Sequence, residues 1–320
     1  MRDVARKLPP LLATLLVVSF LTFLLTSLLP GDPAVQVLGP QSATPEAIAK
    51  VRADLRLDDP LPTRYVAWLG DVASGDLGRS YRTGQEVREA IAERLPVTVQ
   101  VGGMAIVIAL IGAIPLAMVS AYRAGGATDR IVTGTSFGLL AVPSFMMAIL
   151  LIYLFAEVLG LLPATGWVRI GDDLGANLRG AALPALSIAI GELAVYTRLL
   201  RSDMIATLQE DYIALGRAKG MPTFWILLRH ALRPSSFSLL TVVGLQVGAI
   251  LSGSVVVETL FALPGIGRLL VDSIYQRDLV MVQGIALVIA VAYVIVNFAV
   301  DIAYSYLDPR IRRGHAAATA

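Results

Sequence analysis

The chain of 320 residues contains no cysteine. Disulfide bonds, thiol catalysis and cysteine metal sites are therefore excluded, and redox chemistry says nothing about the compartment. Only 16% of the residues are charged, against roughly a quarter in soluble domains, while 56% are hydrophobic. The net charge of +2 leaves no electrostatic footprint for nucleic-acid binding. This composition predicts a membrane protein.

Residues typical of catalytic centres are also scarce. The two histidines, His230 and His315, fall in polar stretches, so no Ser-His pair can form within an apolar segment, and no His-Glu-x-x-His zinc helix occurs. None of the three lysines, Lys7, Lys50 and Lys219, follows the glycine pattern of a P-loop. We therefore expect no catalytic residue, no metal ligand and no cofactor bound by this chain. Energy for any transport must come from another subunit or from an ion gradient.

Apolar runs near the length that a helix needs to cross a bilayer recur along the chain. The first run follows three basic residues, as in a signal peptide, but it is too long for a typical signal and lacks a small-x-small cleavage site before Pro30. We interpret it as an uncleaved span. The sequence predicts an all-α membrane protein with six transmembrane helices, at residues 8–29, 97–121, 131–157, 183–200, 237–257 and 281–304.

The distribution of basic residues predicts the orientation of these spans. If the N-terminus is cytoplasmic, the inner segments hold fourteen lysines and arginines and the two short outer loops hold four. Because positive charge favours the cytoplasmic side, this bias places both termini in the cytoplasm. An even number of spans agrees with that placement.

The long segment at residues 30–96 then lies outside the membrane. The triplet Thr44-Pro45-Glu46 is a helix-start signature before a helix at 47–55, and a second helix is predicted at 61–72. A third helical stretch, 86–94, ends at Pro96. We interpret the segment as a small packed cap; a solvated spacer is the alternative. The predicted domains are accordingly 1–96, the first span with its extracytoplasmic helices, and 97–320, a five-helix core.

A polar, basic loop at about 201–235 separates the fourth and fifth spans. It contains an amphipathic helix that stops at Gly220, and a second short run from 223 to 232 that closes at Pro234. Ile213, Leu215 and Gly216 fall near one helical face. Such a helix suits docking in the groove of a partner, although it could also rest on anionic lipid headgroups. The candidate contact residues are Asp211, Tyr212, Ala214, Leu215, Gly216, Arg217, Lys219 and Gly220.

Several stretches, in order along nearly the whole chain, carry further information. They are Leu-Leu-Pro-Gly-Asp-Pro at 28–33, Leu-Asp-Asp-Pro-Leu at 57–61, Gly-Asp-Leu-Gly-Arg-Ser at 75–80, Arg-Ser-Asp-Met at 201–204, Arg-Ala-Lys-Gly at 217–220, Arg-His-Ala-Leu-Arg-Pro at 229–234, Val-Glu-Thr-Leu-Phe at 257–261, Leu-Pro-Gly-Ile-Gly at 263–267 and Leu-Asp-Pro-Arg at 307–310. Together they resemble the B-type permease subunit of dipeptide and oligopeptide ABC importers.

This resemblance implies the six-span architecture of type I ABC importer permeases in the cell membrane. It implies a second homologous permease subunit, two ABC ATPase subunits or one fused pair, and an extracytoplasmic substrate-binding protein that delivers peptides. ATP and Mg would be used by the partner subunits alone. The stretch at 211–220 resembles the coupling loop, which sits in a groove of the ATPase.

The coupling loop departs from the commonest family pattern of Glu-Ala-Ala, three further residues and Gly. Alignment on Gly220 puts Ala214, Leu215 and Gly216 at the first three places, so the acidic residue is missing. A glycine inside a helix costs about 0.5–1 kcal/mol relative to alanine, unless it allows a close approach. The departure argues against one particular salt bridge to the ATPase.

Two polar residues inside predicted spans are candidates for the translocation path. Glu192 is costly in a membrane unless it faces a cavity or a partner, and it could equally be hydrogen-bonded within the bundle. Gln246 lies beside Gly244 and Gly248, a small-residue stripe suited to close helix packing, either with a second permease or within this subunit. The competing function is a proton-coupled secondary carrier with Glu192 as the proton site, although no internal repeat typical of such carriers is evident.

Overall fold

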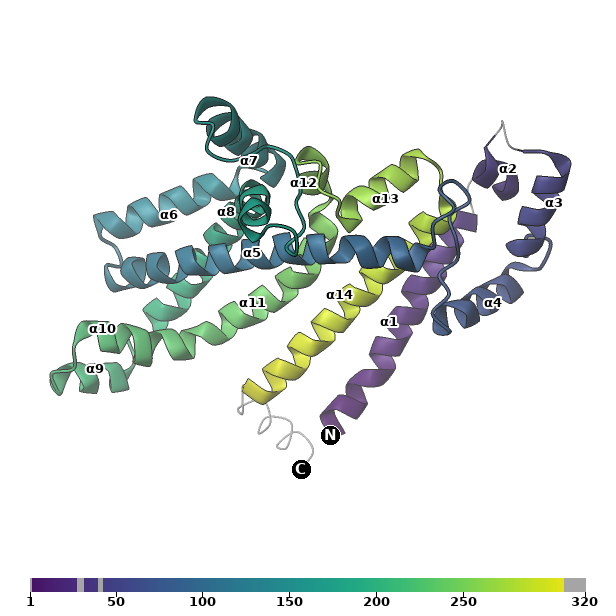
Figure 1. Ribbon diagram of the computed structural model, residues 1–320. Helices are drawn as coiled ribbons and strands as arrows, with labels where there is room; N and C mark the ends of the chain where they lie inside the picture. Colours follow the sequence, from purple (N-terminus) through teal and green to yellow (C-terminus); the bar gives the residue numbers. More distant parts are fainter. Residues whose placement is uncertain (1, 28–31, 40–42, 308–320) are drawn as a thin grey trace. The chain divides into compact units, whose positions relative to one another are not determined.

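The computed structural model describes residues 2–27, 32–39 and 43–307. Within these residues the regular structure is helical, apart from one isolated antiparallel bridge between Arg79 and Glu86. The all-α prediction is confirmed. The chain divides into two compact units, one of residues 1–98 and 264–295 and the other of residues 99–263 and 296–320, and Figure 1 labels their helices.

The first unit begins with four helices, of which α2 was not predicted from the sequence. Asp32 caps α2 by accepting a hydrogen bond from the amide of Ala34 at 2.9 Å, and Thr44 caps α3 through the amide of Ala47 at 3.2 Å. The predicted helices at 47–55 and 61–72 correspond to α3 and α4. The helices that lie wholly in this unit are α1 (Arg2–Ser27), α2 (Pro33–Leu38), α3 (Pro45–Asp54), α4 (Leu61–Ala73) and α13 (Ile266–Tyr275).

The segment between α1 and α5 is packed and is not a loose spacer. The ring of Tyr65 on α4 packs edge to face against the ring of Phe20 on α1, and the Tyr65 hydroxyl forms a hydrogen bond of 2.7 Å with the hydroxyl of Ser19. A separate apolar cluster, including Val87, Ile266 and Ile285, joins the start of α5 (Val87–Tyr122) to α13 and to the start of α14 (Leu279–Leu307). Buried apolar contacts of this kind hold the unit together.

The prediction that a helix ends at Pro96 is wrong, because α5 runs through that residue for 36 residues in all. A proline removes one amide donor but does not by itself stop a helix whose neighbouring turns are packed. Ile91, Val97 and Thr98 are all buried around Pro96. Packing therefore outweighs the lost hydrogen bond at this position.

The second unit contains the remaining part of α5, a series of helices, and the end of α14. The short helices α9 and α10 lie together at one end of α8 and α11 (Figure 1). The helices are α6 (Ala127–Leu140), α7 (Ser144–Leu151), the π-helix η1 (Ile152–Val158), α8 (Leu174–Thr207), α9 (Asp211–Ala218), α10 (Thr223–Trp225), the π-helix η2 (Ile226–Ala231), α11 (Leu232–Gly253) and α12 (Val255–Leu260).

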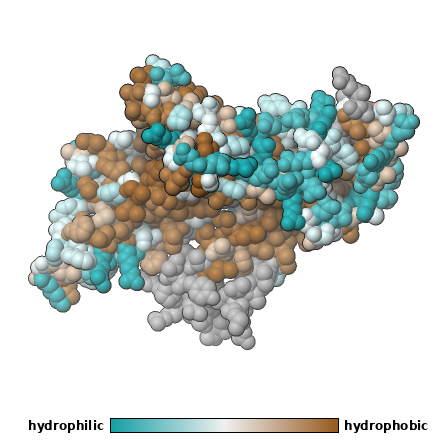
Figure 2. Space-filling view, in the orientation of Figure 1, coloured by the Kyte–Doolittle hydropathy of each residue, from teal (hydrophilic) through white to brown (hydrophobic). Residues whose placement is uncertain are grey.

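Three described helices are long and apolar enough to cross a membrane: Val87–Tyr122, Leu174–Thr207 and Leu279–Val300. A fourth span results if Ala127–Leu140 and Ser144–Val158, which are bent by 99°, count as one. The chain is therefore a multi-pass membrane protein, and apolar side chains cover α7 in Figure 2. The apolar stretch within α1, Pro9–Leu24, is shorter than these.

The prediction of one continuous third helix at 131–157 is wrong in its middle. The helix stops at Leu140 and restarts after Pro143, whose ψ of 147° is extended. The residue before a proline is disfavoured in the α conformation, so the break falls at the position that steric hindrance selects.

Candidate functional site: the loop between α8 and α11

The loop between α8 and α11, residues 208–231, begins with a helix that has a well-defined end. The amide of Gly220 donates to the carbonyl of Arg217 at 3.0 Å, and the amide of Met221 donates to the carbonyl of Gly216 at 3.2 Å. Gly220 has φ +74°, which is the left-handed conformation that this pair of bonds requires. This is the Schellman arrangement, and the predicted stop of the helix at Gly220 is confirmed.

Gly216 has a structural reason to be glycine. A Cβ built on it would lie 3.3 Å from Sδ of Met221, the residue that follows Gly220. In this type of helix end, the residue after the left-handed glycine commonly packs against the last turn. The missing side chain at Gly216 makes room for the Met221 side chain, and this contact offsets part of the conformational cost of a helical glycine.

The face predicted to be one apolar ridge is divided between two surroundings. Ile213 is 1% exposed, because α9 packs on η2 and buries it. Leu215 is 56% exposed. The prediction that these two residues share a face is wrong: Ile213 anchors the helix to its own subunit, and Leu215 is directed to the outside.

Tyr212 makes a second attachment between α9 and η2. Its hydroxyl donates to the carbonyl of His230 at 3.4 Å, which is a long hydrogen bond. In an α-helix that carbonyl would accept from residue 234, which is Pro234 and has no amide hydrogen. Burial raises the pKa of Tyr212, and Glu210 raises it further, so the hydroxyl remains a donor to a higher pH than an ordinary tyrosine would.

Pro234 does not close the second short helical run as predicted. The helical turns pass from α10 through η2 into α11 without a break, and Pro234 lies in the first turn of α11. Prolines are tolerated where neighbouring turns adopt a π form, since this relieves the clash between the ring and the carbonyl one turn earlier. The run is the base of α11 and not a separate helix.

The outer surface of the loop is amphipathic. Of the predicted contact residues, Asp211, Tyr212, Ala214, Leu215, Arg217, Lys219 and Gly220 are exposed, and Gly216 is half-buried. The structure adds Phe224 and Trp225, which are 65% and 48% exposed and were missed. The signal that could have found them is an aromatic pair directly after Pro222, beside a basic helix. Figure 2 shows hydrophilic and apolar side chains mixed over this end.

The two predicted path residues, Glu192 on α8 and Gln246 on α11, contact each other. The Nε2 amide of Gln246 donates a hydrogen bond to Oε1 of Glu192, and both side chains are half-buried. The hydroxyl of Tyr196 comes close to the same carboxyl group without a well-formed hydrogen bond. The bond from Gln246 reduces the cost of Glu192 in a membrane only in part, because the second carboxylate oxygen, Oε2, is buried without a hydrogen-bond partner among the described residues.

The small-residue stripe on α11 is also used within the subunit. A Cβ on Gly244 would lie 2.3 Å from a methyl group of Val300, so α14 approaches α11 closely at this point. Close packing of this kind is the usual role of small residues in membrane helices. Of the two alternatives for Gly244, ordinary packing within the chain is the one that the structure supports.

Comparison with known proteins agrees with this architecture. Residues 113–313 match the family of binding-protein-dependent transport system inner membrane components, and residues 1–102 match the N-terminal family of the same membrane components. A protein named as a peptide transport system permease in Brucella abortus is 40% identical over 312 residues, covering 98% of each chain. The dipeptide transport system permease protein of Bacillus subtilis is 37% identical over 302 residues, covering 94% of each.

A protein of Sinorhizobium fredii named as a peptide ABC transporter permease is 35% identical over 309 residues, which is 97% of this chain and 98% of that protein. The two family models together extend over most of the sequence, and the relatives match along nearly their full length. The chain belongs to the family of inner membrane components of binding-protein-dependent transport systems.

Proposed function

We propose that this chain forms half of the translocation pathway of an ATP-driven importer of dipeptides or oligopeptides. Its partners are a second homologous permease, two ABC ATPase subunits or one fused pair, and an extracytoplasmic binding protein. The chain itself binds no cofactor, and ATP and Mg act on the partner subunits. The names of the relatives support the peptide cargo, since they are peptide and dipeptide permeases.

The observation that carries the proposal is the exposed surface of α9. A helix of eight residues is too short to be stable alone, yet α9 is anchored by Ile213 and Tyr212. It presents Leu215 with Arg217 and Lys219 outward. An apolar side chain flanked by cations on a firmly held helix suits the groove of a soluble subunit.

We further propose six spans with both termini in the cytoplasm. In this topology α1, α5, the bent pair α6 with α7–η1, α8, α11 and α14 are the spans, α9 faces the cytoplasm, and α2–α4 are extracytoplasmic. The charge bias of the short loops supports this orientation.

Two substitutions at Gly220 test the contact with the ATPase. Apart from the adjoining residues, no atom of the described part of the chain lies within 4 Å of a Cβ placed there, so alanine and tryptophan differ mainly in the bulk offered to a partner. Both residues share the conformational cost of φ +74°, roughly 1–2 kcal/mol. We expect Gly220→Trp, but not Gly220→Ala, to lose co-purification of the ATPases while inserting normally in the membrane. Equal retention of the ATPases by both variants would contradict the proposal.

The cysteine-free sequence allows a direct test of the topology. Ser74, which ends α4, and Gln209, which precedes α9, are both exposed. A cysteine at position 74 should react with an impermeant thiol reagent added to intact spheroplasts, and one at position 209 only after the membrane is opened. The reverse pattern would overturn the orientation.

A further inference from the structure

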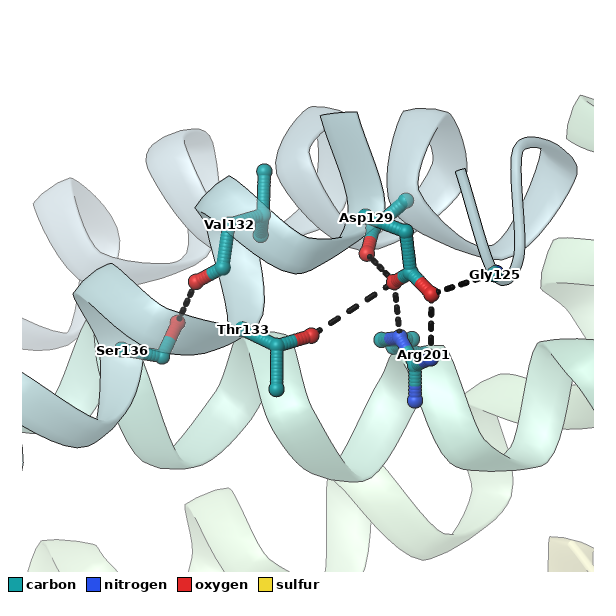
Figure 3. Close-up of polar contacts among 7 residues, drawn as sticks. Gly125, Asp129, Val132, Thr133, Ser136 and Arg201 are labelled. Atoms are coloured by element: carbon teal, nitrogen blue, oxygen red, sulfur yellow. Dashed lines mark hydrogen bonds and ion pairs between the residues drawn. The ribbon is translucent and has the colours of Figure 1, made fainter. Parts of the chain in front are cut away.

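A buried ion pair connects three helices of the second unit near the α8–α11 loop. The carboxylate of Asp129, which is 4% exposed, accepts hydrogen bonds from Nε and Nη2 of Arg201 at 2.5 and 2.7 Å. It also accepts from the amide of Gly125 at 2.8 Å (Figure 3) and from the hydroxyl of Ser120 at 2.5 Å. We call these four residues the clasp.

Each member of the clasp comes from a different element. Ser120 lies at the end of α5, Gly125 in the turn that follows, Asp129 in the first turn of α6, and Arg201 near the end of α8. Gly125 has φ +80°, which bends the chain so that its amide points back to the carboxylate. The clasp therefore fixes the α5–α6 corner to the end of α8 from which the loop departs.

The guanidinium group makes this a rigid connection. Two parallel hydrogen bonds from one planar donor to one carboxylate resist both sliding and rotation, which a single bond to an ammonium group does not. The remaining carboxylate lone pairs are occupied by Ser120 and Gly125, so the buried charge is fully satisfied. A saturated, buried network of this kind keeps one geometry.

A hydrogen bond also joins the two helices at the ends of the loop. The hydroxyls of Thr207, the last residue of α8, and Ser235, in the first turn of α11, are 2.9 Å apart. With the burial of Ile213 and the bond from Tyr212, this holds the end of α8, α9, η2 and the start of α11 as one body.

We propose that Asp129 and Arg201 transmit movement of the α8–α11 loop to the α5–α6 corner, so that the loop drives four helices and not only the two to which it is covalently joined. The inference rests on the proposed function, in which α9 is the contact with the ATPase. It assigns a role to Arg201, the first residue of the Arg-Ser-Asp-Met stretch at 201–204. Both residues act by positioning helices and touch no substrate.

The test uses the complete complex of both permeases, the ATPases and the binding protein in proteoliposomes. The variants are Arg201→Lys and Asp129→Asn, and the matched control is Arg198→Lys. Arg198 lies one turn earlier on α8, is exposed, and contacts the ring of Phe137 on α6 at 5.6 Å without a buried ion pair. The measured quantity is peptide imported per ATP hydrolysed, together with the amount of ATPase that co-purifies.

We expect both clasp variants to retain the ATPases and to hydrolyse ATP, but to import several-fold less peptide per ATP. Arg198→Lys should behave as the wild type. An unchanged ratio in assembled clasp variants would show that the clasp is only a static anchor and would overturn the inference. Absence of the ATPases from the wild-type complex would instead refute the proposed function, and this inference with it.

A second measurement does not require active variants. Cysteines at Ala127 on α6 and Gln209 before α9, both exposed positions, can carry spin labels in the otherwise cysteine-free subunit. If the clasp transmits movement, the distance between the labels stays constant when the assembled wild-type complex binds ATP, and changes in Asp129→Asn. A distance that changes equally in both backgrounds would overturn the inference.

Discussion

The opposite surroundings of Ile213 and Leu215 lead to a prediction that separates the attachment of α9 to this chain from the contact of α9 with the ATPase. Replacing Ile213 by alanine removes a side chain that is 1% exposed, which typically costs about 2–5 kcal/mol. The hydrogen bond from Tyr212, at 3.4 Å, supplies at most about 0.5 kcal/mol at that length, so burial of Ile213 dominates the attachment of α9. Since α9 is too short to persist unattached, the loss should melt it locally.

The assay is amide hydrogen exchange of residues 211–218 in the reconstituted subunit. A loss of about 2 kcal/mol or more corresponds to exchange at least about 30-fold faster, where opening of α9 limits the rate. Ile213→Val, which costs about 0.5–1.5 kcal/mol, should give an intermediate rate. Regions of α8 distant from the loop serve as the internal reference.

Leu215→Ala is the matched control, because Leu215 is 56% exposed in the isolated subunit. An exposed helical substitution changes stability by only about 0.5 kcal/mol, so exchange in α9 should stay close to the wild-type rate. Retention of the ATPases should nevertheless fall in this variant. Exchange that accelerates equally in Ile213→Ala and Leu215→Ala would refute the assignment of the two residues to opposite faces.

Three further predictions concern other parts of the chain. Burial raises the pKa of Tyr81 to about 12, and the charge of Asp54 adds to the effect. The contribution of this phenol to stability is therefore complete below the ordinary tyrosine pKa of about 10 and is lost as pH rises through about 12. An ultraviolet titration compared with that of Tyr81→Phe should show one late-titrating phenol. Gly216→Ala should change the thermal stability of the subunit little, because the helix-propensity gain of about 1 kcal/mol is offset by a methyl group 3.3 Å from Met221; a large loss in a melting assay would contradict this balance. Glu192→Gln should reduce ATP-driven uptake only modestly, and gradient-driven uptake by the lone subunit that this substitution abolishes would establish the secondary-carrier alternative.

Local chemistry accounts for the parts of the fold that the sequence predicted well. The cap at Thr44 and the stop at Gly220 depend on short-range hydrogen bonds and on one residue in a left-handed conformation, so a few neighbouring residues determine them. Pro96 and Pro143 show the limit of this reasoning. A helix continues through the first and breaks before the second. The difference lies in the packing of the flanking turns, which the residue type does not encode.

The side-chain contacts that define the site could not be predicted from the sequence either, because they also depend on tertiary packing. Asp129 and Arg201 are 72 residues apart, and although Arg201 lies in the Arg-Ser-Asp-Met stretch, nothing in either local pattern indicates the other residue as its partner. Ile213 and Leu215 are nearly adjacent, and hydropathy cannot say which of two apolar residues on a short helix faces the subunit. Only the path of η2 beneath α9 decides this.

Because η2 is a π-helix, the direction of α9 relative to α11 depends on both the length and the helical form of residues 226–231. In a π-helix each bond spans five residues where an α-helix spans four, so η2 accommodates more chain per turn than regular α geometry would. An α form of this segment that is one residue shorter would leave the direction of α9 nearly unchanged, because the π form holds about one extra residue over the same turns. The same residues in the α form would instead rotate everything before them by about 100° relative to α11, since one residue of an α-helix turns through that angle. Leu215 would then be turned away from its present direction. Chimeras between related permeases would therefore have to keep the length of this segment matched to its helical form, whatever side chains it carries.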